Sequence, residues 1–301
     1  MTDLSVIICT HNPRLDYFSR TLAALQVQSL PQDRWEILVI DNSSTQPVAE
    51  RFDFRWHSRC RVVSEPKLGL TPARLRGIAE TRGKLLVFVD DDNVLDCNYL
   101  ETALAIARNS PYLGSWSGQC RPEFEQVPPD WTRRYWGNLV IRQFDKDSWS
   151  NLPRLPETMP CGAGLCVRRE VAAHYLAINQ AGERVIQLDR TGDSLLSGGD
   201  NDLAACACDI GLGVGLMSDL KLTHLISPSR LTEDYLTRLV EGIAYSSILL
   251  DRERGIIHPP RGALSRLADY VRTLLLAGPH RRVLRAAHRG RDRAIRGLTA
   301  S

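Results

Sequence analysis

The sequence predicts an α/β fold with a doubly wound, mostly parallel sheet. Short β-branched runs alternate with helix-like stretches over the first hundred residues, a pattern typical of parallel strands joined by crossover helices. The predicted strands are residues 4–9, 36–41, 61–64 and 85–90. The predicted helices are residues 17–29 and 71–81, the second with Thr71 as its N-cap and Pro72 at its first helical position.

The remainder of the chain predicts loops, one further strand and long helices. Tryptophans, prolines and charges are interleaved from residue 111 to 160, which favours long loops around a few strands. A strand is expected at residues 163–167, a helix from Glu170, and a glycine-rich loop at residues 192–200. Residues 231–250 and 263–276 have the periodicity of C-terminal helices.

The composition is that of an ordered globular protein. Of 301 residues, 43% are hydrophobic and 24% charged, which excludes a chain that is disordered throughout. The start, MTDLSVIICTHNP, lacks the features of a secretory signal, and no apolar run has the length of a membrane span. The eight cysteines lack the paired spacing of a zinc site, so we expect reduced thiols in a cytoplasmic protein.

Positive charge is concentrated at the C-terminus. The net charge is +3, yet residues 280–301 contain seven arginines and one aspartate, so the rest of the chain is mildly acidic. We expect this segment to lie in plane on the anionic inner face of a membrane, as a peripheral contact. A solvated helix without a partner is the alternative. Nucleic acid is not expected as a partner, because the segment has no aromatic residues to stack on bases.

Polar residues follow all four predicted N-terminal strands. In a doubly wound sheet, ligands bind beyond the carboxyl ends of the strands, so these residues are expected to share one cleft. They are Thr10, His11 and Asn12 after the first strand, Asp41 and Asn42 after the second, Glu65 and Lys67 after the third, and Asp90, Asp91 and Asp92 after the fourth.

The strongest chemical signal is the segment LLVFVDDDN, in which a buried strand ends in three carboxylates. Adjacent carboxylates repel one another unless a cation compensates them, and Mg²⁺ and Mn²⁺ prefer oxygen ligands. Because side chains alternate along an extended chain, Asp90 and Asp92 share a side, one towards a nucleotide ribose and one towards a metal on its phosphates. The alternative is a solvated acidic turn.

Four further polar residues are candidates for the same cleft. Asp200, in SGGDNDLAA, is placed either to accept a proton from an acceptor hydroxyl or simply to cap a helix, and the same choice applies to Asp202. His224 follows an apolar strand and would supply a nitrogen ligand to the metal, with a structural histidine as the alternative. Arg74, near a helix start, suits a diphosphate, with a surface arginine as the alternative.

Taken together, these stretches resemble the family 2 glycosyltransferases, which are inverting enzymes of the GT-A fold. SVIICTHNP is similar to the family's opening strand and loop, VIDNSS to its nucleotide-binding aspartate, and GLTPARLRGI to its Gly…Ala-Arg helix. FVDDDN resembles the metal motif, CGAGLCVRREV the strand beside the donor sugar, and GGDNDL the Glu-Asp catalytic motif. Two positions depart from the family pattern: Leu75 replaces an asparagine and Gly199 replaces the glutamate before Asp200.

The resemblance implies a role for each matching residue. Asp200 would be the general base, and Asp202 would share acceptor binding or compete for the role of base. Asp92 and His224 would hold Mg²⁺ or Mn²⁺. The residues implied to bind the nucleotide are Thr10, Asn12, Asp41, Arg74, Asp90 and Asp91.

The implied function is that of an inverting glycosyltransferase of the hexosyltransferase class, acting in polysaccharide or glycoconjugate biosynthesis. It would move a sugar from a nucleoside-diphosphate donor, with UDP favoured, to a hydroxyl of a sugar, lipid-linked or small-molecule acceptor. Residues 1–110 would form the nucleotide-sugar-binding, Rossmann-like half of the catalytic domain, and residues 111–230 the acceptor-binding and catalytic half. Residues 231–301 would form C-terminal helices with a basic tail. Trp131 and Trp136 are candidates to stack on acceptor sugars, with burial as the alternative.

Two other functions stay open at this point. A catalytically inactive nucleotide-sugar-binding or regulatory protein is favoured by the Gly199 departure and opposed by the joint presence of Asp92, Asp200 and His224. A nucleotidyltransferase would share the sheet, but such enzymes normally open with a glycine-rich phosphate loop, and THNPRLD contains no glycine.

Overall fold

The computed structural model describes residues 2–184, 195–259 and 262–300. The chain divides into two compact units. The first comprises residues 1–123, 140–185 and 200–226, and the second comprises residues 124–139, 186–199 and 227–301. Part of the predicted glycine-rich loop, residues 192–194, lies outside the described residues.

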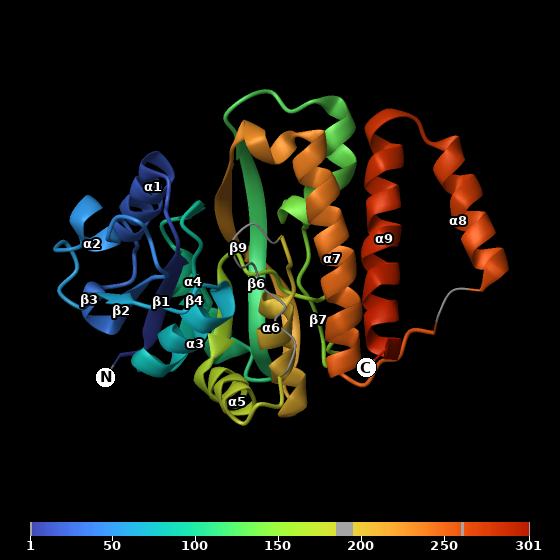
Figure 1. Ribbon diagram of the computed structural model, residues 1–301. Coiled ribbons are helices and arrows are strands. Elements are labelled where there is room, and N and C mark those ends of the chain that lie inside the picture. Colours follow the sequence, from blue (N-terminus) through green and yellow to red (C-terminus); the bar gives the residue numbers. More distant parts are fainter. Residues whose placement is uncertain (1, 185–194, 260–261, 301) are drawn as a thin grey trace. The chain divides into compact units, whose positions relative to one another are not determined.

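The first unit is built on one mixed sheet, in which the described residues form nine strands (Figure 1). The strands are β1 (Leu4–Thr10), β2 (Trp35–Asp41), β3 (Cys60–Ser64), β4 (Leu85–Phe88), β5 (Asn93–Leu95), β6 (Leu113–Phe124), β7 (Ser148–Ser150), β8 (Leu165–Arg168) and β9 (Gly213–Ile226). The helices of this unit are α1 (Leu15–Gln26), η1 (Gln32–Arg34), α2 (Val48–Arg51), α3 (Leu70–Glu80), α4 (Tyr99–Asn109), α5 (Arg169–Gln180) and α6 (Gly199–Asp209).

The strand order is β3-β2-β1-β4-β8-β6-β9-β5, with β7 also paired to β9. The four N-terminal strands are parallel, which confirms the predicted crossover pattern. Beyond β4, the pairs β4–β8, β6–β8, β5–β9 and β7–β9 are antiparallel. The sheet therefore combines a parallel half with an antiparallel extension.

Helices cover both faces of the sheet, because alternate residues of each strand point to opposite sides. On one face, Val6 and Ile8 of β1 pack in a cluster that includes Phe18 of α1 and Leu100 of α4. On the other face, Ile7 packs in a cluster with Ile78 of α3 and with residues of α5 and α6. Burial on both faces explains why these strands read as continuous apolar runs.

Two local predictions were wrong. Helix α3 begins at Leu70 rather than after Thr71, and its N-cap is Gly69 with φ 138°, a backbone angle that side-chain-bearing residues rarely adopt. The second concerns His224, which was predicted to follow an apolar strand and instead lies within β9. The tryptophan-rich stretch contains the strands β6 and β7 between its loops, as predicted, and Trp116 of β6 is fully buried in the core.

The second unit is helical. Its elements are η2 (Asp130–Leu139), η3 (Pro228–Leu231), α7 (Glu233–Glu253), α8 (Ala263–Leu275) and α9 (Gly278–Ala300). Helices α7 and α9 lie side by side (Figure 1), with Leu249 and Ile295 in one shared cluster. Gly290 permits this close approach, since a methyl group there would lie 2.2 Å from the carbonyl oxygen of Glu241. The predicted basic tail is thus a packed helix.

No helix within the described ranges combines the length and the apolar content that crossing a bilayer requires. This finding concerns spanning segments only.

Candidate active site

The carboxyl ends of the parallel strands meet at one edge of the sheet. Thr10 is the register partner of Asp41, and the backbone N–H of Val89 donates to the carbonyl of Ile7 at 3.0 Å. Thr10 also donates a side-chain hydrogen bond to the carboxylate of Asp91. The predicted polar residues after β1, β2 and β4 therefore lie at a common edge, as the parallel pairing requires.

Asp41 and Asn42 organise the loops at this edge. The carboxylate of Asp41 accepts backbone N–H groups from Ser44 at 3.2 Å and Val48 at 2.9 Å, so it also fixes the turn into α2. The side chain of Asn42 donates to the carbonyls of Glu65 and Lys67 and accepts from the N–H of Gly69 at 2.8 Å. Asn42 was predicted only as one polar residue in the cleft, and nothing local in the sequence indicates this bridging role.

Asn12 joins two of the loops. Its φ of 49° is left-handed, a region in which asparagine is favoured among non-glycine residues. Its side-chain oxygen accepts hydrogen bonds from the backbone N–H and the hydroxyl of Thr45, at 2.8 and 2.9 Å. These bonds support a structural role for Asn12, and its predicted contact with a nucleotide stays a prediction.

The acidic turn after β4 lies against β9. His224 is the register partner of Asn93, and its Nε2 lies 3.4 Å from Oδ2 of Asp92. Asp92 and His224 are each only 5% exposed. The other oxygen of Asp92 accepts a hydrogen bond from the side chain of Asn93 at 2.9 Å, which holds the carboxylate in place. An imidazole nitrogen and a carboxylate oxygen at this separation fit two ligands of one divalent cation.

Asp200 reaches the same edge through β8. Leu165 pairs with Phe88, so the segment before β8 lies beside the turn that follows β4. Within that segment, the N–H of Gly162 donates to Oδ2 of Asp200 at 2.7 Å. Arg74 of α3 is 5% exposed, and a methyl group on Gly162 would lie 3.3 Å from its Nη2 and 3.0 Å from Oδ2 of Asp200. The side chains of Arg74 and Asp200 therefore both lie close to Gly162.

Two buried thiols connect these groups electrostatically. The sulfurs of Cys120 and Cys161 are 4.0 Å apart. The hydrogen bond between them lowers the pKa of the Cys161 thiol and, together with burial, raises the pKa of Cys120 well above its ordinary value. The charge of Asp90 acts on Cys120 and that of Asp200 acts on Cys161. Asp90 and Asp200 are thus within electrostatic range of one thiol pair.

Asp202, by contrast, is engaged in a buried ion pair. It is 3% exposed, and its Oδ2 lies 3.0 Å from Nε of Arg184. Because a buried carboxylate needs a compensating charge, this contact supports a structural role. Its predicted role towards the acceptor stays a prediction.

Trp131 and Trp136 both belong to η2, in the second compact unit. The Trp136 ring packs against Phe124 with centroids 5.0 Å apart, and its Nε1 donates to the hydroxyl of Thr132 at 3.2 Å. Trp131 lies 6.1 Å from the ring of Tyr135. Both rings are partly buried by neighbours in their own unit, and acceptor stacking by either stays a prediction.

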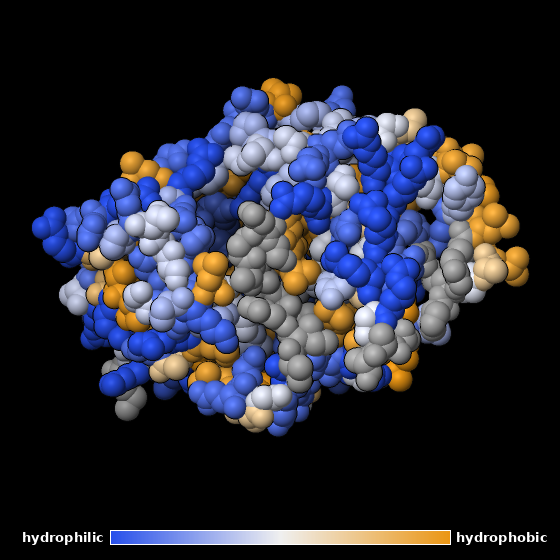
Figure 2. Space-filling view, viewed as in Figure 1, coloured by the Kyte–Doolittle hydropathy of each residue, from blue (hydrophilic) through white to orange (hydrophobic). Residues whose placement is uncertain are grey.

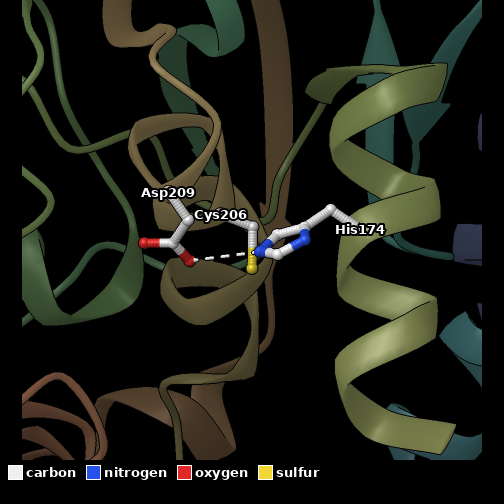
Figure 3. Close-up of side chains that lie close together, drawn as sticks. All are labelled: His174, Cys206 and Asp209. Atoms are coloured by element: carbon white, nitrogen blue, oxygen red, sulfur yellow. Dashed lines mark ion pairs between the residues drawn. The ribbon is translucent and has the colours of Figure 1, made fainter. Parts of the chain in front are cut away.

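A separate group of metal-ligating types lies between α5 and α6 (Figure 3). His174, Cys206 and Asp209 each offer one ligand atom, all within 4.8 Å of one another. His174 and Asp209 already form a partly exposed pair at 3.8 Å. This pair bridges the two helices, and the trio contains none of the residues predicted to bind the metal.

Comparison with known proteins identifies the family. A model described as glycosyl transferase family 2 matches residues 5–175, more than half of the chain. The chain belongs to glycosyl transferase family 2. Glycosyltransferase AglE of Haloferax volcanii is 30% identical over 92 residues, which cover 30% of this chain and 30% of AglE. An uncharacterized glycosyltransferase of Rickettsia bellii is 24% identical over 195 residues, covering 58% of this chain and 27% of that protein. The match thus spans under a third of each relative.

Solved structures show the same fold. The structure of S. aureus TarS 1-349 in complex with UDP-GlcNAc has a TM-score of 0.55 at 15% identity, covering 100% of this chain and 91% of that one. The mannosyltransferase PcManGT from Pyrobaculum calidifontis, in complex with GDP-Man and Mn²⁺, has a TM-score of 0.54 at 17% identity, covering 100% and 75%. The predicted GT-A type of α/β fold is therefore confirmed.

Proposed function

We propose that this chain transfers a sugar from a nucleoside-diphosphate donor to an acceptor hydroxyl with inversion at the anomeric carbon. The observation that carries the proposal is that the side chains of Asp200 and Arg74 both lie close to Gly162, at the edge of the sheet where Asp90, Asp91 and Asp92 follow β4. A base and a cation held beside a cluster of acids are the groups that a single in-line displacement needs. Family membership and the nucleotide-sugar complexes of the similar structures support it.

Asp200 is the proposed general base. One of its oxygens accepts a hydrogen bond from the N–H of Gly162, which orients the carboxylate. A carboxylate held in this way accepts the proton of the acceptor hydroxyl as the hydroxyl oxygen attacks the sugar, an effect worth about 10²–10⁴ in rate. The anomeric carbon then exchanges its bond to the diphosphate for one to the acceptor oxygen.

Arg74 and the acidic turn are proposed to hold the donor. The buried guanidinium of Arg74 suits the departing diphosphate, because its donors match phosphate oxygens in a bidentate geometry. Asp41 would bind the nucleobase and Asp90 the ribose. The residues that would border the nucleotide are Thr10, Asn12 and Asp91. Asp92 and His224 would hold Mg²⁺ or Mn²⁺, which offsets diphosphate charge when bound. We favour a uridine nucleotide, in line with the UDP complex of TarS.

The test is release of nucleoside diphosphate from a panel of UDP-, GDP- and dTDP-sugars, measured with Mg²⁺, with Mn²⁺ and with a chelator. We expect release from one donor class, dependent on the metal and reduced about 10²–10⁴-fold in Asp200→Asn. Full activity in that variant would refute the base assignment. Tight nucleotide-sugar binding without release under every condition would favour the alternative of an inactive binding protein, which Gly199 in place of glutamate suggests.

A further inference from the structure

Helix α8 carries its hydrophobic side chains on the surface of the second unit. They recur at spacings of three and four residues, so they share one face of the helix. These residues, each between 45% and 84% exposed, are Leu264, Leu267, Tyr270, Val271, Leu274 and Leu275. A contiguous apolar face that a protein leaves in water marks an interaction site.

The opposite side of α8 holds the helix against α9. Asp269 lies 3.5 Å from Nδ1 of His288, and Thr273 is only 5% exposed. The hydroxyl of Thr273 is itself satisfied by the carbonyl of Asp269 at 2.7 Å. The helix is therefore docked through its polar residues, while its apolar face points away from α9. In a helix packed on the core of a water-soluble protein, the apolar face would instead point towards its neighbour.

Arginines form a stripe along the neighbouring helix. Spacings of three and four residues place five exposed arginines on one face of α9, namely Arg282, Arg285, Arg289, Arg293 and Arg296. Glu233 pairs with Arg282, and Glu241 pairs with Arg289 and Arg293. Even so, residues 263–300 contain nine arginines against two aspartates and no glutamate. Figure 2 shows this hydrophilic surface over α9 beside the hydrophobic patch over α8.

We propose that α8 inserts its apolar face into the surface of an anionic lipid bilayer while the arginine stripe of α9 contacts the lipid headgroups. The bilayer is the occupant that matches both features, because it offers hydrocarbon and negative charge side by side. A second copy of the chain matches only the first, since pairing through α8 would bring two strongly basic surfaces together. This inference does not depend on the proposed function. The basic C-terminal segment was expected from the sequence to lie on the membrane. In this proposal the helix that enters the bilayer is α8, which precedes that segment.

Sedimentation with vesicles tests the proposal. The full-length chain should bind vesicles of phosphatidylcholine mixed with phosphatidylglycerol and bind pure phosphatidylcholine far more weakly. The double variant Leu267→Glu/Leu274→Glu should lose at least about tenfold in affinity, because both side chains enter the bilayer. Arg285→Gln and Arg296→Gln should each cost roughly fivefold on the anionic vesicles, and high salt should have a similar effect.

Matched controls separate insertion from general effects of charge. Val127 and Leu152 are 94% and 55% exposed and lie outside α8 and α9, so Val127→Glu/Leu152→Glu should bind vesicles like the wild type. Circular dichroism should show that all variants are folded. Equal binding by the α8 variant and this control would overturn the proposal. So would a wild-type dimer that ignores vesicles and that the α8 variant converts to a monomer, since a second copy would then be the occupant.

Discussion

His224 lies with its Nε2 3.4 Å from Oδ2 of Asp92, although the two residues are far apart in the chain. The contact follows from the antiparallel pairing of β5 and β9, in which Asn93 faces His224 and the N–H of Leu225 donates to the carbonyl of Asp92 at 2.9 Å. The register of the β5–β9 pair therefore places the side chains of Asp92 and His224 next to each other.

Replacement of the proposed metal ligands should change the metal dependence of donor binding. Asp92→Asn and His224→Gln each remove one ligand of the pair while preserving size, so Mn²⁺ should enhance nucleoside-diphosphate binding less in each variant, by roughly 10–100-fold. Titration calorimetry with UDP, in the presence and absence of Mn²⁺, measures this enhancement. An unchanged metal enhancement in both variants would place the cation elsewhere.

Substitutions of Asp200 and Asp202 should have different effects, with turnover reduced in the first case and stability reduced in the second. Asp202→Asn leaves Arg184 buried beside a neutral partner, and we expect a loss of about 3 kcal/mol in unfolding free energy, because breaking a buried pair costs that order. Asp200→Asn, at a partly exposed position, should alter stability far less and turnover far more. Urea unfolding and nucleotide release measured on both variants provide the check. The reverse outcome would transfer the role of base to Asp202.

A methyl group at Gly162 should damage the site without unfolding the protein. It would lie 3.0 Å from Oδ2 of Asp200 and 3.3 Å from Nη2 of Arg74, closer than side chains ordinarily approach. Gly162→Ala should therefore displace one or both groups and lower kcat by about 10²-fold, the scale expected when a catalytic group is misplaced. Gly137→Ala is the control, because a methyl group there meets nothing within 4 Å. Equal kinetics in the two variants would contradict the arrangement at Gly162.

Acidification should destabilise the first unit through His57. Burial, and to a lesser extent the charge of Arg59, lowers the pKa of His57 below its ordinary value of 6.5, and its Nδ1 accepts the N–H of Arg59 at 3.2 Å. Because the folded state resists the proton that the unfolded state takes up, stability is unaffected above pH 6.5 and falls as pH drops below it. His57→Gln should flatten the pH dependence of the urea midpoint between pH 7 and about 5. Parallel pH profiles of variant and wild type would exclude this contribution.

The sequence predicted the parallel half of the sheet and the residues at its strand ends, because these depend on short-range patterns. A buried strand is recognisable from its apolar run, and the triplet Asp90, Asp91 and Asp92 stands out because carboxylates at such a strand end need compensation. The antiparallel extension was harder to predict, since its strands depend on long-range pairing that the sequence does not specify locally.

The local patterns of the chain were enough to predict the class of fold and the set of chemical groups available to the site. The contacts among those groups became known from the folded chain: Asp200 with Gly162 and Arg74, Asp202 with Arg184, and the apolar face of α8 with solvent. The physical reason is that strand and helix periodicities act over a few residues, whereas these contacts join segments tens of residues apart. Such pairings depend on sheet register and helix packing, which no local pattern encodes.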